Sequence, residues 1–437
     1  MLKSNKQSLH LAASPVYLAS TAVNNLICGS PRGTAYFVGV ALMTMMTGQL
    51  MHHQGSLARA ALPSVRQIKW GWHRVERAMA RGRFSLDALI ESAFQWCLLH
   101  LQVEPVVIGQ ERRHIYAIDS STIARRRSMK ATTVLGKGYS HVAGRAVKAN
   151  LVASLSCVVT INGIRCGLVR QTRCAHSSEQ AVAALFSELP QTEENRLLTV
   201  DAGMATKEQF AAASRRDALS GRLRSNVTLR RAPRPVRKRP RGRPRIHGAT
   251  LHPGRPRPEV STDEDILIKV EKREVRLRRW RNLHFVGQHK TTIDVVRVDD
   301  PDFKRPLLIG TTALELTTEE IREAYLHRWP VETNFYVSQA TTARERPRAW
   351  TETSVKRRLS LALMTGSLLK AISAQCEAWP RGPWDRRAVS SAGRLAHHLD
   401  AHSQKFAALS LSGIRARNYC KKEDANDSSS LQLSEAA

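Results

Sequence analysis

Two short apolar runs in the chain each end in an aspartate, Ile115–Asp119 and Leu197–Asp201. Apolar runs of this length indicate buried strands. Stretches with helical spacing lie between and after them, and this alternation is typical of an α/β core. The carboxyl ends of the strands are the usual edge for a functional site in such a sheet, so both aspartates are candidate site residues. Each aspartate alone could instead form a turn or cap a helix.

The chain divides by pattern into five segments. Apolar residues recur at helical spacing up to about residue 110, for example over Leu86–Leu101, without strand-like alternation. Strand-like and helical runs alternate after that point, and a basic, proline-rich stretch interrupts them at Arg231–Arg245. The predicted domains are a helical N-terminal domain at 1–110, an α/β core at 111–225 and 313–375, a β-rich insertion at 226–312, and a helical region with a disordered tail at 376–437.

Local signals place the elements inside these segments. The predicted strands are His114–Asp119, Val147–Thr160, Ile164–Val169, Leu197–Val200, Ile266–Trp280, Phe285–Lys290, Thr292–Val298 and Leu307–Thr312. The predicted helices are Trp70–Met79, Leu86–Leu101, Ser178–Leu189 with Ser177 or Ser178 as its cap, Lys207–Leu219 and Thr353–Ser373. A further helix begins at the capping box of Thr317 and Glu320 and continues through Glu332.

The charge of the chain is strongly positive. Lys and Arg number 68 against 37 Asp and Glu, which gives a formal net charge of +31. Such an excess favours a polyanionic partner, either nucleic acid or an anionic membrane surface. The run Gly33–His52 carries no full charge and is long enough to suggest a membrane span, but its threonines and its lack of flanking aromatic residues favour a buried helix. The N-terminus does not have the pattern of a signal peptide.

Cysteine usage indicates the compartment. Seven cysteines are present, and no two form a C-x-x-C pair. We therefore expect reduced thiols in a cytosolic protein. Cys166, Cys174 and His176 could form a zinc site, but their spacing fits no common zinc module.

A second cluster of polar residues lies far downstream, at Tyr325, Arg328 and Glu332. Their relative positions of 0, 3 and 7 bring the side chains to one face of a helix, and Gln339 falls within the same arc. The planar fork of an arginine can bind a phosphate, and a tyrosine can donate to another. Pro330 favours a kink or a helix start within this stretch. The alternative is a surface helix with an i,i+4 Arg–Glu pair, which stabilises little.

Asp119, Asp201 and Glu332 could converge in space. Carboxylates that meet repel each other unless cations neutralise them, and magnesium prefers carboxylate oxygens. Two such ions about 3.5–4 Å apart can activate an attacking oxygen and stabilise a leaving one during phosphodiester cleavage. The sequence therefore predicts metal-assisted chemistry on DNA.

These residues together resemble the bacterial insertion-sequence DDE transposases of the Tyr-Arg-Glu-Lys signature group. The signature of that group reads Y-x2-R-x3-E-x6-K, and Tyr325, Arg328 and Glu332 match it in register. The resemblance covers about residues 112–375 and includes the segments 138–145 and 222–226. Gln339 stands in place of the signature lysine, so that contact is weakened or supplied by Arg344.

The resemblance implies a ribonuclease H-like core, with the β-rich insertion between the second aspartate and the glutamate. Asp119, Asp201 and Glu332 would be the catalytic, metal-binding triad for Mg²⁺, for which Mn²⁺ can substitute. Tyr325, Arg328 and Gln339 would contact DNA. The implied reaction is hydrolysis at the ends of the element to free a 3′-hydroxyl, which then attacks target DNA.

The resemblance also implies partners and a location. These are double-stranded DNA, both the terminal repeats of the element and the target, and a second subunit in the DNA-bound synaptic complex. The N-terminal helices would bind the terminal repeats. We expect no membrane partner, and a cytoplasmic, nucleoid-associated protein.

Trp280 is the candidate for a further role that the resemblance suggests. Some relatives form a DNA hairpin and stack a flipped base on a tryptophan of the insertion. Trp280 lies in the insertion within the run RLRRWRNLHF. The alternative is a tryptophan packed on a sheet face among arginines.

The basic stretch of the insertion resembles an AT-hook core, with DNA-binding candidates Arg241, Arg243 and Arg245. An extended Arg-Gly-Arg-Pro segment can lie in a narrow A·T minor groove, where the negative potential attracts arginine. The alternative is a basic loop with only non-specific phosphate affinity. For the whole protein we favour an active transposase over a non-catalytic AT-hook architectural protein and over an inactivated relative or structure-specific nuclease.

Overall fold

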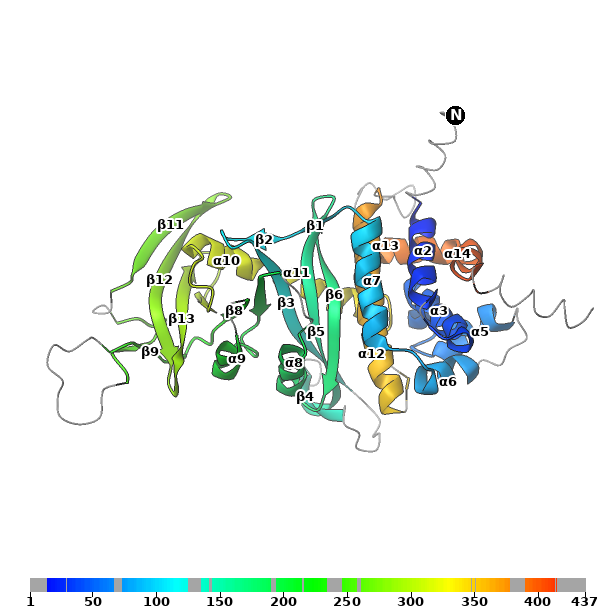
Figure 1. Cartoon of the computed structure of the whole chain (residues 1–437), viewed down its shortest axis with the longest axis horizontal. Coiled ribbons are helices and arrows are strands. Elements are labelled where there is room, and N and C mark those ends of the chain that lie inside the picture. Colours follow the sequence, from blue (N-terminus) through cyan, green and yellow to red (C-terminus); the bar gives the residue numbers. More distant parts are fainter. Residues whose placement is uncertain are drawn as a thin grey trace, which may run out of the picture.

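One large mixed β-sheet runs through the computed structural model (Figure 1). The structure describes residues 14–28, 30–66, 73–124, 135–140, 144–189, 194–213, 216–233, 246–257, 261–346, 348–349, 351–377, 390–412 and 414. Within those ranges the sheet has fourteen strands, and its main path follows the order β1-β5-β3-β7-β8-β14-β13-β12-β9-β10. The chain is therefore a mixed α/β protein, as the alternation of strand and helix patterns predicts.

Five strands form the centre of the α/β part: β3 (Arg113–Ala124), β5 (Arg145–Ile161), β6 (Ile164–Ala175), β7 (Arg196–Val200) and β8 (Asp217–Arg222). β5 is antiparallel to both β3 and β6, whereas β3, β7 and β8 run parallel to one another. All five residues of β7 are buried. A strand covered on both faces is expected to be a continuous apolar run, which is why this strand could be predicted from the sequence.

Helices connect the parallel strands. α8 (Ser178–Ser187) leads from β6 to β7, and the Ser177 side chain accepts the Gln180 N–H over 3.1 Å, which confirms Ser177 as the cap. α9 (Lys207–Ala212) leads from β7 to β8. The prediction of a helix over Lys207–Leu219 is wrong at its end, because Leu219 is a buried residue of β8.

The β-rich insertion continues the same sheet. It contains β9 (Leu229–Arg231), β10 (Thr250–Leu251), β11 (Glu264–Val270), β12 (Arg273–Phe285) and β13 (Gln288–Asp299), and β14 (Leu307–Thr311) joins it to β8. The predicted strand Ile266–Trp280 is two strands, because the chain turns between β11 and β12 with Glu271 at φ 56°. The predicted strand Phe285–Lys290 is likewise interrupted, at Gly287 with φ 85°.

Three short strands lie beside the core: β1 (Val103–Pro105), β2 (Val107–Ile108) and β4 (Leu135–Ser140). β1 and β4 pair with β5, and β2 pairs with β3.

The N-terminal part is helical. It comprises α2 (Pro15–Cys28), α3 (Arg32–Met46), α4 (Gln49–His52), α5 (Leu57–Arg66), α6 (His73–Arg81) and α7 (Leu86–His100). The uncharged run at Gly33–His52 forms α3 and α4, and most of α3 is buried. Among the residues that the structure describes, no helix has the length and apolar character that a membrane crossing needs.

One long helix is shared between the sheet and the helical part. α12 (Glu352–Gln375) packs against β6 on one side and against α3, α6 and α7 on the other. Figure 1 shows α7 and α12 between the sheet and a group of helices that includes α2, α3, α5, α6, α13 (Ala392–Ala401) and α14 (Ser403–Ser410). α12 is buried nearly all round, as expected for a helix in a core. The helical part and the sheet therefore share one continuous hydrophobic core.

Candidate active site

Asp119 lies in β3, and Asp201 is the first residue after the neighbouring strand β7. The parallel register of β3 and β7 pairs Ile118 with Val200, so the next residues along both strands are the two aspartates. Neighbouring strands are about 4.8 Å apart, which places two carboxylates close together. β7 ends at Val200, whereas β3 continues with β5 alone as its partner. The two aspartates therefore stand where the pairing of β3 and β7 stops.

Two helices bring the downstream residues to this edge. α10 (Thr318–Leu326) carries Tyr325 and α11 (Trp329–Ala340) carries Glu332. The capping box of Thr317 and Glu320 is confirmed. The single helix predicted through Glu332 is instead two helices, because Pro330 has no N–H to continue α10 and occupies the first turn of α11.

Direct contacts connect these helices to the aspartates. Tyr325 Oη donates to Asp201 Oδ1 over 3.3 Å. Arg328 Nη1 lies 3.7 Å from Asp119 Oδ2, and Arg328 Nη2 pairs with Glu332. Arg222 Nη1, at the end of β8, lies 4.0 Å from Asp201 Oδ1. The structure thus brings together all three predicted carboxylates with Tyr325 and Arg328.

Asp119 has a raised pKa. The pKa is about 6, chiefly because the carboxylate is buried, and the neighbouring Glu332 and Asp201 carboxylates contribute smaller increases. Arg328 and the Ser120 N–H, which donates to Asp119 over 2.7 Å, oppose this rise. Carboxylates with pKa values raised by burial and by like charges are typical of functional sites and of sites that take up a cation.

Arg328 is the cation at the centre of the site. Burial acts to lower its pKa, but Tyr325, Glu332 and Asp119 together outweigh burial, so the pKa of Arg328 is raised. In the described part of the chain, its Nε and Nη1 atoms are buried without a hydrogen-bond acceptor. Buried donors without acceptors cost free energy, and a guanidinium satisfies such donors best with the oxygens of a phosphate or carboxylate. Arg328 is therefore suited to receive a phosphate.

The carboxylates offer hard oxygen donors of the kind that Mg²⁺ prefers. Asp119 and Asp201 have the placement to share an ion, whereas Glu332 is engaged by Arg328. Across the described ranges, no three His, Cys, Asp or Glu side chains form a group that could hold a metal ion. This holds for Cys166, Cys174 and His176 as well, so the possible zinc site is not present there.

The remaining predicted DNA contacts lie in different surroundings. Gln339 is exposed near the end of α11. Arg344 is 3% exposed, donates to Ser121 Oγ over 2.7 Å, and has a pKa lowered to about 10 by burial, so it stands beside the strand of Asp119. Arg241, Arg243 and Arg245 lie outside the described residues.

Trp280 is fully buried in β12, and so is its neighbour Arg279. Successive strand residues point to opposite faces, so both faces of β12 are covered at this point. Trp280 offers no exposed ring for a base. Its stacking role stays a prediction that requires the ring to become accessible.

The sequence reasoning missed two exposed aromatic residues of α11. Trp329 is 63% exposed and Tyr336 is 69% exposed. They are seven positions apart and Glu332 lies between them, a spacing that places all three along one side of a helix. That spacing could have been noticed in the sequence, because exposed aromatic rings beside a phosphate site are suited to stack on bases.

Comparison with known protein families agrees with this geometry. The transposase DDE domain family matches residues 111–365, a range that contains both aspartates, Glu332 and most of α12. The chain belongs to this family of transposases. No curated protein sequence is significantly similar to the chain.

Proposed function

We propose that the protein is an active DDE transposase that cuts DNA at the ends of its element and joins the freed 3′-hydroxyl ends to target DNA. The observation that carries this proposal is the position of Asp119 and Asp201, which directly follow the last residue pair of β3 and β7, with Tyr325 in contact with Asp201 and Arg328 beside Asp119. The order β6-β5-β3-β7-β8, with β5 antiparallel to its neighbours, supports the ribonuclease H-like core that the resemblance implies. The match of Tyr325, Arg328 and Glu332 supports the Tyr-Arg-Glu-Lys signature group.

Asp119 and Asp201 would hold a divalent cation, and Glu332 would join them when its ion pair with Arg328 opens. Magnesium, when bound, would help an oxygen nucleophile attack the phosphodiester and would stabilise the leaving oxygen. Asp119 must be ionised to bind a cation. Its raised pKa makes that step dependent on pH near neutrality.

Arg328 and Tyr325 would bind the DNA backbone at the cut. Arg328 has two buried donors without acceptors, and a phosphate oxygen would supply an acceptor for them. This exchange would also release Glu332. Tyr325, through its bond to Asp201, fixes the orientation of one carboxylate.

The DNA partners would be the terminal repeats of the element and the target, engaged by a dimer in the synaptic complex. The net charge of +31 supports a strong and salt-dependent interaction with phosphates. The basic stretch with Arg241, Arg243 and Arg245 would add minor-groove contacts.

The test is cleavage of DNA that carries the flanking ends of the element, in Mg²⁺ and in Mn²⁺. Asp119→Asn, Asp201→Asn and Glu332→Gln keep the size of each side chain and remove its charge. We expect all three to abolish cleavage while DNA binding persists. Asp87→Asn is the control, since Asp87 is an exposed carboxylate paired with Arg173 on the helical side and should leave cleavage unchanged.

Two outcomes would contradict the proposal. If the wild-type protein binds the ends and cuts in neither metal, the protein is an inactivated relative or an architectural DNA-binding protein. If cleavage survives all three substitutions, the assigned carboxylates are not the catalytic ones.

A further inference from the structure

A fully desolvated ion pair lies inside the insertion. Arg279 of β12 is 0% exposed and Asp294 of β13 is 2% exposed. Arg279 Nε and Nη2 donate to Asp294 Oδ2 over 3.0 and 2.5 Å. Burying two charges is costly, and their attraction offsets that cost only when further hydrogen bonds complete the arrangement. The other contacts of this pair therefore indicate what it does.

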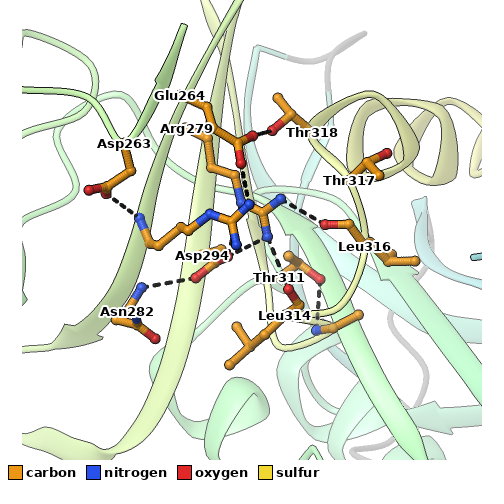
Figure 2. Close-up of polar contacts among 12 residues, drawn as sticks. Asp263, Glu264, Arg279, Asn282, Asp294, Thr311, Leu314, Leu316, Thr317 and Thr318 are labelled. Atoms are coloured by element: carbon orange, nitrogen blue, oxygen red, sulfur yellow. Dashed lines mark hydrogen bonds and ion pairs between the residues drawn. The ribbon is translucent and has the colours of Figure 1, made fainter.

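Arg279 also holds the segment that leads into α10 (Figure 2). Its Nη1 donates to the carbonyl oxygen of Leu316 over 2.7 Å, and its Nη2 donates to that of Leu314 over 3.1 Å. Leu316 directly precedes Thr317, the N-cap residue of α10. A planar guanidinium can bind a carboxylate and two carbonyls at once in a fixed geometry, which an ammonium group cannot do. The insertion thus holds the backbone from which α10 starts.

Asp294 fixes the strand from which Arg279 extends. The pairing of β12 with β13 shifts between Trp280 and Leu283, and Asn282 has φ 54° there. The N–H of Asn282 donates to Asp294 Oδ1 over 2.9 Å, so both oxygens of the carboxylate are used (Figure 2). A bulge of this kind redirects neighbouring side chains. Asp294 therefore stabilises the local strand geometry that aims Arg279 at the loop.

Two further contacts hold the same segment. Thr318, the first residue of α10, donates through its hydroxyl to Glu264 of β11, and Glu264 also pairs with Arg281. On the core side, Arg113 Nε at the start of β3 donates to Glu315 Oε1 over 2.5 Å. The segment 313–318 is thus held between the insertion and the strand that carries Asp119.

α10 connects the segment held by Arg279 to the candidate active site. The helix spans nine residues from Thr318, and Tyr325 lies two turns along it, about 10 Å at 1.5 Å per residue. We propose that Arg279 is a positioning residue for the transposase site: it sets the start of α10 and thereby the contact of Tyr325 with Asp201. This inference rests on the proposed function. Misplacing a group of a reactive site by about 1 Å can lower a rate about a hundredfold.

The test compares two lysine substitutions in β12. Arg279→Lys keeps the charge that faces Asp294 and removes the fork that reaches Leu314 and Leu316. Arg278→Lys is the matched control, because Arg278 is the adjacent residue and pairs with Asp299 over 2.7 Å. Each variant is made in the wild-type and in the Tyr325→Phe protein. The measurements are the single-turnover cleavage rate at saturating end DNA with Mg²⁺, the affinity for that DNA, and hydrogen exchange of the α10 amides.

We expect Arg279→Lys to lower the cleavage rate about tenfold or more, to leave the DNA affinity unchanged, and to speed exchange in α10. The rate effect should disappear in the Tyr325→Phe background, because a residue that acts through Tyr325 is not additive with it. Arg278→Lys should change none of the three. An equal rate loss in both backgrounds, or an unchanged exchange of α10, would overturn the inference.

The double variant Arg279→Met with Asp294→Asn tests the same contact in case Arg279→Lys does not fold. This neutral pair leaves no unpaired buried charge, and the amide oxygen introduced at position 294 can still accept the N–H of Asn282. It should give the same rate loss and the same faster exchange as Arg279→Lys. If the wild-type protein binds DNA without cutting it, the proposed function fails. Hydrogen exchange of the α10 amides is then the only test of the inference. Faster exchange in the Arg279 variants supports a positioning role for Arg279, and unchanged exchange contradicts it.

Discussion

Tyr325 donates a hydrogen bond to Asp201 over 3.3 Å, although the two residues are 124 positions apart in the chain. The bond joins the last turn of α10 to the end of β7, where the parallel pairing with β3 stops. The bond fixes the orientation of the Asp201 carboxylate, which lies near the like-charged carboxylate of Asp119. This contact is one of several that join the upstream and downstream parts of the domain, together with that of Arg328 with Asp119 and that of Arg344 with Ser121.

Tyr325→Phe should slow cleavage more than it weakens DNA binding. The substitution removes one hydrogen bond to a carboxylate, of the kind that contributes about 1.5–3 kcal/mol, so we expect a fall of about tenfold to a hundredfold in the single-turnover rate. Thermal unfolding should change little, because the ring that fills the space remains. A rate equal to that of the wild type would show that the orientation of Asp201 does not depend on Tyr325.

Stability should depend on pH through Asp119. Its pKa rises from 3.8 in the unfolded chain to about 6 in the folded protein, so the folded state binds the proton more tightly. The resulting stabilisation is complete below about pH 4 and is lost as the pH rises through about 6. The difference between the two pKa values corresponds to about 3 kcal/mol in the free energy of unfolding. Urea unfolding of the wild type and of Asp119→Asn across this range measures it, since the difference between the two proteins should follow the titration.

Divalent cations should stabilise the folded protein above about pH 6, where Asp119 is ionised. We expect Mg²⁺ to raise the Tm of the wild type and to leave the Tm of Asp119→Asn and Asp201→Asn unchanged. Glu332→Gln should keep part of the shift, because Glu332 is paired with Arg328. Equal shifts in all four proteins would place the binding site of the ion elsewhere.

The two tryptophans Trp280 and Trp329 should respond in opposite ways to alanine. Trp280 is fully buried, and removing it should cost about 3–5 kcal/mol of stability through the cavity left behind. Trp329 is 63% exposed beside Glu332, so its removal should leave stability unchanged and weaken binding of end DNA. Urea unfolding and a DNA-binding titration separate the two effects. Unaltered DNA binding by Trp329→Ala would exclude a contact with bases.

Much of the site could be predicted from the sequence because its signals are local. Asp119 and Asp201 end apolar runs that any buried strand would show, and the capping box of Thr317 fixes the start of α10. Pro330 indicated a kink or a helix start, and the structure has a helix start there. The ribonuclease H-like core, the signature group and the metal triad stay predictions.

Other features depend on contacts between distant residues. The run Asp217–Arg222 has no strand signal of its own, and it becomes β8 through pairing with β7 and β14. A Cβ atom at position 221 would lie 2.6 Å from Cγ2 of Val200, so the close packing of β8 against β7 requires glycine there. Trp280 is buried because other parts of the protein cover both faces of β12. The proposed role of Arg279 depends on its hydrogen bonds to a loop more than thirty positions later in the chain.

The position of α12 has a consequence for how such proteins diversify. A domain attached by a linker can be exchanged for another without disturbing the rest of the protein. Here the helices at 15–100 cover one side of α12, and β6 covers the other. Removing those helices would expose a long apolar surface and cause aggregation. These helices therefore cannot be replaced as a module, and their surface chemistry can change only through substitutions on their outer surface.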